Sequence, residues 1–243
     1  MKILNIMKVD PAKINKADER FQKFTEIVTA RQDLLPDEFI KCARPFEDSY
    51  KKLKLPELAC ERFFDLAQKF TEMGKLDLAG IICSRLVKFT NIPFETKEKY
   101  ILLALDIAEK QNDKIHSAAR LEDLHKGYEE NDDIAKLLKC LTKEENVLKD
   151  IVNDFDTAQK NFRTILYKNE EIENFENILA TVQVDIAKFI IRKKPKKAAQ
   201  KLQDALKFFD RIGDRDRYEF AEKMLLRANY YREVGKTSKR NRC

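Results

Sequence analysis

The fold is indicated by two stretches of sequence, residues 63–74, FFDLAQKFTEMG, and residues 100–111, YILLALDIAEKQ. Each carries an aromatic residue, a small residue, a large residue and a turn residue in steps of four, three and four: Phe63, Ala67, Phe70 and Gly74, then Tyr100, Ala104, Ile107 and Gln111. These steps place the first three side chains on one face of a helix, which the fourth residue ends. Repetition of the pattern after 37 residues predicts an array of helical hairpins.

Composition restricts the fold class further. The 243 residues include 5 Gly, 6 Pro and no Trp, with 43% hydrophobic and 37% charged residues. This leaves enough apolar side chains for a core but too few turn residues for an all-β or α/β protein. We therefore expect an all-α chain of about eleven helices. Residues 1–235 would form one elongated domain, because helical arrays extend unit by unit, and residues 236–243 a disordered basic tail.

Local signals divide this array into units. Pro45 lies inside the expected helix that begins at Pro36, so a kink or a split at Arg44 is predicted. Thr142 and Glu145 have the spacing of a capping box, and a change of phase near residue 169 predicts a long antiparallel hairpin over 142–192. One continuous helix is the alternative there. The remaining units are expected as hairpins at 56–92, 95–128 and 172–211, followed by a capping helix over 214–235.

The two stretches resemble the tetratricopeptide repeat. The first repeat is carried by Phe63, Leu66, Ala67, Phe70, Gly74, Ala79, Cys83 and Leu86, and the second by Tyr100, Leu103, Ala104, Ile107 and Ala118. Residues 182–205 match more loosely, and the likeness covers about half the chain. The sequence departs from the family pattern at the first position, which is Phe, Tyr or Val rather than Trp, and at the turn glycine, which Gln111 and Lys193 replace.

This resemblance implies that the chain binds a peptide or a helix of another protein in a concave groove made by the first helices of the repeats. One version of the family holds a terminal carboxylate with Lys and Asn side chains. The corresponding positions here are Phe64, Gln68, Ile101 and Leu105, so that version is not expected. The resemblance supplies no other contact residues.

Cysteine usage and the N-terminal residues suggest a cytoplasmic protein. The five cysteines include no closely spaced pair, and Cys60 and Cys83 lie on apolar helical faces. We expect reduced thiols in a reducing compartment and no disulfide framework. The start, MKILNIMKVD, is too short and too polar for a secretion signal, and no apolar run is long enough to span a membrane.

Residue patterns that would indicate an enzyme or a metal site are weak. Glu122 and His125 have the spacing of a di-iron ligand pair, but the only other histidine, His116, lies nine residues away on the same expected helix. We expect surface or packing histidines, no metal and no cofactor. Cys60, Cys83 and Cys140 are expected as buried structural thiols rather than nucleophiles. No carboxylate is expected within an apolar face, and no phosphate-binding glycine loop is present.

The strongest candidate site is a basic group near the C-terminus. Residues 188–243 carry 18 Lys/Arg against 7 Asp/Glu, although the whole chain has a net charge of only +6. Pro195 predicts a helix start inside this region, and cations there repel the positive end of the helix dipole, a cost of about 0.3–1 kcal/mol that an anionic partner could reverse. The candidate residues for binding an anionic partner are Arg192, Lys193, Lys194, Lys196, Lys197 and Lys201. The alternative is a solvated, lysine-rich surface that serves solubility.

The leading hypothesis is a non-enzymatic adaptor or scaffold that captures a peptide or helix of a protein partner, with the basic end giving orientation and rate. The second is a nucleic-acid-associated helical protein that uses the same basic end. A helical-bundle enzyme is the third. The sequence does not determine the oligomeric state.

Overall fold

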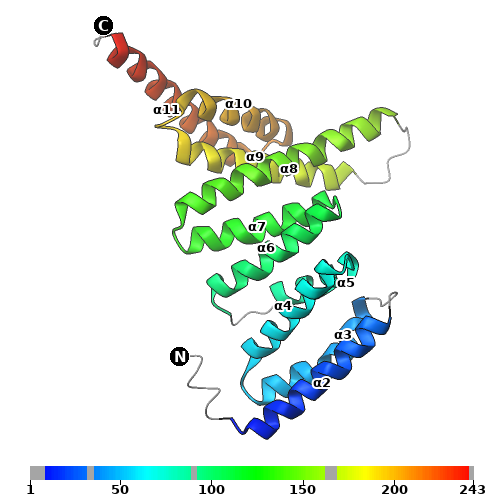
Figure 1. Cartoon of the computed structure of the whole chain (residues 1–243). Coiled ribbons are helices and arrows are strands. Elements are labelled where there is room, and N and C mark those ends of the chain that lie inside the picture. Colours follow the sequence, from blue (N-terminus) through cyan, green and yellow to red (C-terminus); the bar gives the residue numbers. More distant parts are fainter. Residues whose placement is uncertain (1–8, 32–35, 89–91, 162–168, 241–243) are drawn as a thin grey trace. The chain divides into compact units, whose positions relative to one another are not determined.

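The chain is helical throughout the part that the structure describes. The computed structural model describes residues 9–31, 36–88, 92–161 and 169–240, and these contain ten helices and no strand (Figure 1). The helices are α2 Pro11–Ala30, α3 Pro36–Lys52, α4 Pro56–Glu72, α5 Leu76–Val87, α6 Phe94–Lys110, α7 Lys114–Glu130, α8 Ile134–Asn161, α9 Asn169–Ile190, α10 Pro195–Ile212 and α11 Arg215–Arg240. The predicted all-α class is confirmed.

The helices belong to two compact units, Met1–Asp113 with α2–α6 and Lys114–Cys243 with α7–α11. Within each unit, every helix packs on the next one along the chain, and α4 also contacts α6. This is the expected array of helical hairpins. The boundary falls within the predicted hairpin 95–128, so α6 pairs with α5 in unit 1 and α7 with α8 in unit 2. A single domain over 1–235 stays a prediction.

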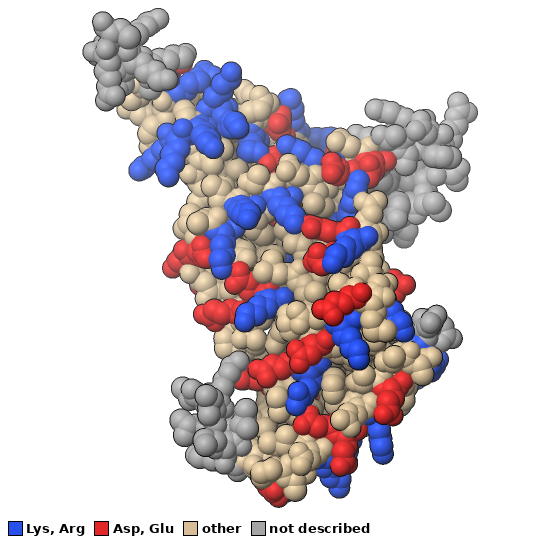
Figure 2. Space-filling view, viewed as in Figure 1, with Lys and Arg blue, Asp and Glu red and all other residues tan. Residues whose placement is uncertain are grey.

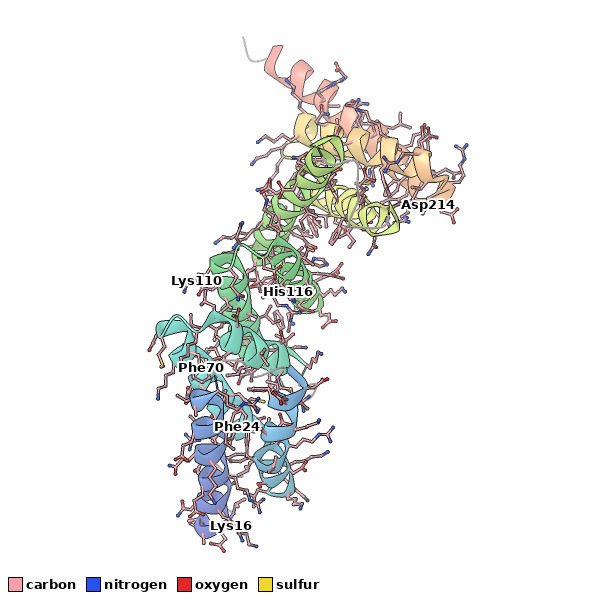
Figure 3. All side chains as sticks on the ribbon, turned by 90° about the vertical axis from the view of Figure 1, so that its right-hand side faces the viewer. Lys16, Phe24, Phe70, Lys110, His116 and Asp214 are labelled. Carbon is pink, nitrogen blue, oxygen red and sulfur yellow. The ribbon has the colours of Figure 1, made fainter. Side chains whose placement is uncertain are left out.

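An aromatic cluster fills the core of unit 1. Phe63 of α4 lies within 4.7–6.1 Å of three other phenylalanine rings, measured between ring centroids. All four rings are fully buried, and one of them, Phe24 of α2, is labelled in Figure 3. Because the rings come from three consecutive helices, the cluster joins α2, α3 and α4: Phe24, Phe39, Phe46 and Phe63.

Smaller side chains fill the core of unit 2. The faces shared by α9, α10 and α11 are rich in alanine, which lets helix axes approach closely. Two phenylalanines of α10 complete this core: Phe208 and Phe209. The positions predicted on α10, Ala198, Leu202 and Ala205, belong to this core, whereas Val182 and Ile186 of α9 are buried outside it.

In the described part of the chain, five helices end with a backbone hydrogen bond from an N–H group to the carbonyl five residues earlier. These bonds follow a residue in the left-handed conformation, as in the Schellman motif. Gly74 has the predicted positive φ of 72°. In the second repeat, however, Asn112 and not Gln111 is left-handed, with φ 54° against −83°. The loop residue therefore falls one position later than the 37-residue period predicts.

The structure bears on two other local predictions. Pro45 does not split its helix, since α3 runs from Pro36 to Lys52. The helix predicted to begin at Thr142 begins at Ile134 instead. The Asp133 carboxylate just before it accepts a hydrogen bond from the Lys136 N–H at 3.1 Å, as an N-cap residue does. The Thr142 hydroxyl instead donates to the Leu138 carbonyl at 2.8 Å. The predicted capping box is thus wrong, while the long hairpin is present as α8 and α9.

The C-terminal end of α11 also extends beyond its predicted limit. Residues 236–240, assigned by sequence to a disordered tail, belong to α11, and residues 241–243 lie outside the described residues. Lys and Arg are abundant in this segment, and cations near a helix C-terminus favour the helix dipole.

Lys54 is left-handed, with φ 59°, at the end of α3. The left-handed conformation costs a residue with a Cβ about 1–2 kcal/mol, and glycine avoids this cost. Glycine also has a larger conformational entropy in the unfolded chain, which offsets about 0.5–1 kcal/mol of the stabilisation. We therefore expect Lys54→Gly to raise the free energy of unfolding by about 0.5–1 kcal/mol in urea titrations. The matched change Gly74→Ala should lower it, and a stabilising effect of Gly74→Ala would contradict the explanation.

Candidate interaction surface at the α9–α10 turn

The structure brings five of the six predicted cations together on one turn of unit 2. Helix α9 ends at Ile190, residues 191–194 form the turn, and Pro195 begins α10. Lys194, at the N-cap of α10, makes no side-chain capping hydrogen bond. The five side chains are exposed: Arg192, Lys193, Lys194, Lys196 and Lys197. Figure 2 shows Lys and Arg gathered over this end of the unit.

Lys201 does not belong to this exposed group. Its ammonium group binds the Glu145 carboxylate on α8, and the other oxygen of that carboxylate lies 2.8 Å from Lys149 Nζ. Burial opposes ionisation of Glu145, but the two ammonium groups more than offset it, so the pKa of Glu145 is lowered. Lys201 therefore joins α10 to α8 and serves the fold, which is a correction to its predicted role.

The remaining lysines of the turn have no acidic neighbour. Among the described residues, no carboxylate pairs with the four turn lysines: Lys193, Lys194, Lys196 and Lys197. They surround the N-terminus of α10, where the positive end of the helix dipole adds to their mutual repulsion. Arg192 stacks on the Tyr231 ring of α11, with its guanidinium carbon 6.0 Å from the ring centroid. The surface thus carries positive charge that no carboxylate of the described residues neutralises.

The positions that would hold a ligand in the carboxylate-binding version of the repeat are largely covered in unit 1. Ile101 and Leu105 are only 1% and 4% exposed. Phe64 is half-buried and contacts the Tyr100 ring at 5.2 Å. Gln68 alone is exposed. Capture of a partner through these four residues is therefore not supported.

Sequence reasoning missed two buried carboxylates on α8. The side chains of Glu144 and Glu145 are only 1% and 3% exposed, contrary to the expectation that no carboxylate lies in an apolar face. Glu144 could have been recognised, because it continues the apolar spacing of Leu137, Cys140 and Leu148. Glu145, the other buried carboxylate, was predicted to belong to a capping box with Thr142.

Glu144 binds His125 of α7, with 2.6 Å between its Oε2 and the ring Nδ1. Burial of the ring opposes protonation, but this hydrogen bond and the charge of Glu144 more than offset it, so the pKa of His125 is raised above 6.5. Glu122, predicted as a possible partner ligand, instead pairs with Lys126 at 2.5 Å. The Glu122–His125 step therefore does not form a metal site.

The thiol of Cys140 lies near the same pair but is not poised for nucleophilic attack. Its Sγ donates to the Leu121 carbonyl at 3.3 Å. Burial, assisted by the negative charge of Glu144, raises the pKa of Cys140 to about 12. Cys60 and Cys83 are buried as well, which confirms that these three cysteines lie within the core.

The His125–Glu144 pair makes the stability of unit 2 depend on pH. The pKa of His125 is higher in the folded protein than in the unfolded chain, where it is near 6.5. The ion pair therefore contributes its full stabilisation below about pH 6.5 and loses it as the pH rises through the folded-state pKa. We expect the free energy of unfolding to fall as the pH rises from about 6.5 through the raised folded-state pKa of His125. The double variant His125→Leu/Glu144→Leu should lose this dependence, whereas His116→Gln should keep it. Urea titrations across this range measure it, and an unchanged profile in the double variant would exclude the pair as its source.

A second buried network links three helices of unit 1. The Tyr50 hydroxyl donates to Asp18, and Arg62 donates to the same carboxylate through Nε at 3.1 Å. Burial, together with the hydrogen bond to Asp18, raises the pKa of Tyr50 to about 12. These groups satisfy one another and hold α2, α3 and α4 together.

Within the described residues, no group of three or more His, Cys, Asp or Glu side chains could hold a metal ion. None of the helices in that same part of the chain is both long and apolar enough to cross a bilayer.

No protein-family model matches the chain, and no curated protein sequence matches it. The resemblance to the tetratricopeptide repeat therefore stays a prediction. The array of helical hairpins stands on the structure alone.

Proposed function

We propose that the chain is a non-enzymatic adaptor that binds a negatively charged protein partner at the α9–α10 turn. The observation that carries this proposal is the group of four turn lysines, which lack an acidic partner among the described residues. Their repulsion, added to the α10 dipole, disfavours the isolated protein, and a carboxylate-rich segment would relieve it. Stacked hairpins supply a rigid frame for such a surface.

The buried titratable groups support an adaptor rather than an enzyme. His125 is held by Glu144, Glu145 by two lysines and Tyr50 by Asp18. Each of these groups is engaged in joining one helix to another. The raised pKa of Cys140 also disfavours thiolate chemistry. We further propose that the chain works with reduced cysteines in the cytoplasm, as its cysteine usage suggests.

The test compares proteins captured by three forms of the full chain. The turn variant is Lys193→Gln/Lys194→Gln/Lys196→Gln/Lys197→Gln. The charge control removes four exposed lysines of unit 1 in the same way, at Lys13, Lys16, Lys69 and Lys99. Quantitative mass spectrometry after nuclease treatment should show partners retained by the wild type and the control but reduced at least about tenfold by the turn variant. Equal capture by all three forms, or no capture, would contradict the proposal.

Nucleic-acid binding is the alternative function, because the same four lysines could contact phosphate groups. Phosphate contacts release counterions, so binding of an RNA or DNA oligonucleotide must weaken steeply as salt rises. Filter-binding titrations with the wild type and the turn variant separate the two functions. Salt-dependent retention that the turn variant abolishes would favour the alternative over the adaptor.

A further inference from the structure

The outer face of α11 carries an exposed apolar strip. Leu226, Tyr230 and Val234 are 66%, 65% and 45% exposed. Their spacing of four residues places them in one line along the helix. We name these three residues the α11 strip.

This strip lies opposite the face that α11 buries. Ala221, Met224 and Ala228 pack in the core of unit 2, and α11 is the last helix of that unit. At 100° per residue, Tyr230 points about 160° away from Ala228, so it faces away from α10. A helix that ends an array normally has a polar outer face. The α11 strip departs from this rule and indicates a docking surface.

One cation of the α9–α10 turn reaches the neighbour of a strip residue. Arg192 stacks on Tyr231, and the rings of Tyr231 and Tyr230 lie 5.7 Å apart. Arg227 is exposed beside Leu226 and has no acidic partner among the described residues. These ring contacts connect the basic turn to the apolar strip, and Figure 2 shows Lys and Arg concentrated at this end of the unit.

The opposite end of α10 is different. There, Asp214, labelled in Figure 3, pairs with Arg217 at 2.5 Å, and Arg211 pairs with Glu176. The cations at that end are neutralised within the unit. The uncompensated positive charge of α10 therefore coincides with the exposed strip of α11.

We propose that the α11 strip and its flanking cations dock an acidic amphipathic helix of a partner protein. This inference rests on the proposed adaptor function and names the partner's chemistry. The partner helix would lay apolar side chains, spaced at i, i+3 or i+4 and i+7, along Leu226 and Tyr230. Carboxylates on one of its flanks would lie against Arg227 and the four turn lysines.

Charge complementarity disfavours the other occupants. In an antiparallel pair of two copies related by a two-fold axis, the cationic flank of one α11 would meet the same flank of the other, and like charges repel. Nucleic acid would satisfy the cations but would leave Leu226 without an apolar partner. An acidic amphipathic helix complements both features.

The test uses a displayed library of helical peptides with randomised charges and apolar positions. The full chain is the selection target, and affinities of synthetic copies of the enriched peptides are measured by fluorescence anisotropy. Three variants are compared with the wild type: the turn variant, the strip variant Leu226→Gln/Tyr230→Gln, and an apolar control in unit 1, Ile27→Gln/Leu102→Gln. Glutamine preserves helix propensity, and circular dichroism checks folding.

We expect the enriched peptides to be acidic and amphipathic. They should bind the strip variant and the turn variant at least about tenfold more weakly than the wild type, and bind the control as tightly as the wild type. Peptides that weaken only on the turn variant would overturn the inference and leave the adaptor function standing. Enrichment of neutral or basic peptides, or strip-dependent self-association in sedimentation, would also overturn it. Absence of any binder, together with absence of captured proteins, would overturn both.

Discussion

Replacing Phe63 by alanine is expected to lower the free energy of unfolding by about 3–5 kcal/mol, the usual effect of removing a buried aromatic ring. Phe63 is fully buried, and its ring contacts those of Phe24, Phe39 and Phe46. These partners lie on α2 and α3, so the substitution opens a cavity where three helices meet. The loss should be large because aromatic pairs add about 0.5–1.5 kcal/mol beyond burial of area.

The neighbouring Phe64 provides a matched control. It is half-buried and has one ring partner, Tyr100, so Phe64→Ala should cost clearly less than Phe63→Ala. Urea titration of the full chain measures both losses, and hydrogen exchange locates them in α2, α3 and α4. A loss below about 1 kcal/mol for Phe63→Ala would show that the cluster does not hold unit 1 together.

Replacing Lys201 by methionine is expected to lower the free energy of unfolding by about 2–3 kcal/mol. The change leaves Glu145, whose side chain is 3% exposed, with Lys149 as its remaining ammonium partner. Loss of one partner of a buried charge is costly because the other charge stays buried. Methionine keeps the apolar part of the side chain, so packing is little changed.

Two controls separate the ion pair from other effects. Lys207→Met changes a lysine that is 79% exposed and lies 3.9 Å from Asp204, and should alter stability by less than about 0.5 kcal/mol. Glu145→Gln/Lys201→Met removes both charges and should recover much of the loss. Urea titrations of the wild type, Lys201→Met, Glu145→Gln and the double variant give the coupling free energy. A single Lys201→Met variant as stable as Lys207→Met would refute the structural role of Lys201.

Much of the fold could be predicted from spacing. The apolar positions around Phe63 and Tyr100 identified α4 and α6, and the change of phase near Asn169 separated α8 from α9. Gly74 marked a left-handed turn because only glycine enters that conformation without strain. The position of Asn112 could not be read with the same accuracy, since asparagine adopts either conformation and its neighbours decide.

The candidate site was found only in part. The exposed lysines around Pro195 were recognisable as a charge run at a helix start, and the structure places them together on the turn. Lys201 is also a lysine and lies one helical turn after Lys197, so the sequence offered no reason to expect that it would be less exposed than the lysines around Pro195. Its partner, Glu145, lies 56 residues away in the chain.

By itself, the sequence determined which residues form helices and which face of each helix is apolar, because apolar residues recur along the chain with the 3.6-residue period of a helix. Only the tertiary structure decided which neighbour covers each face. The ion pair between Lys201 of α10 and Glu145 of α8 engages a buried carboxylate that helix periodicity alone did not predict to be buried, whereas α11 keeps Leu226 and Tyr230 exposed. The physical reason is that burial depends on contacts between residues far apart in the chain, which local periodicity does not encode.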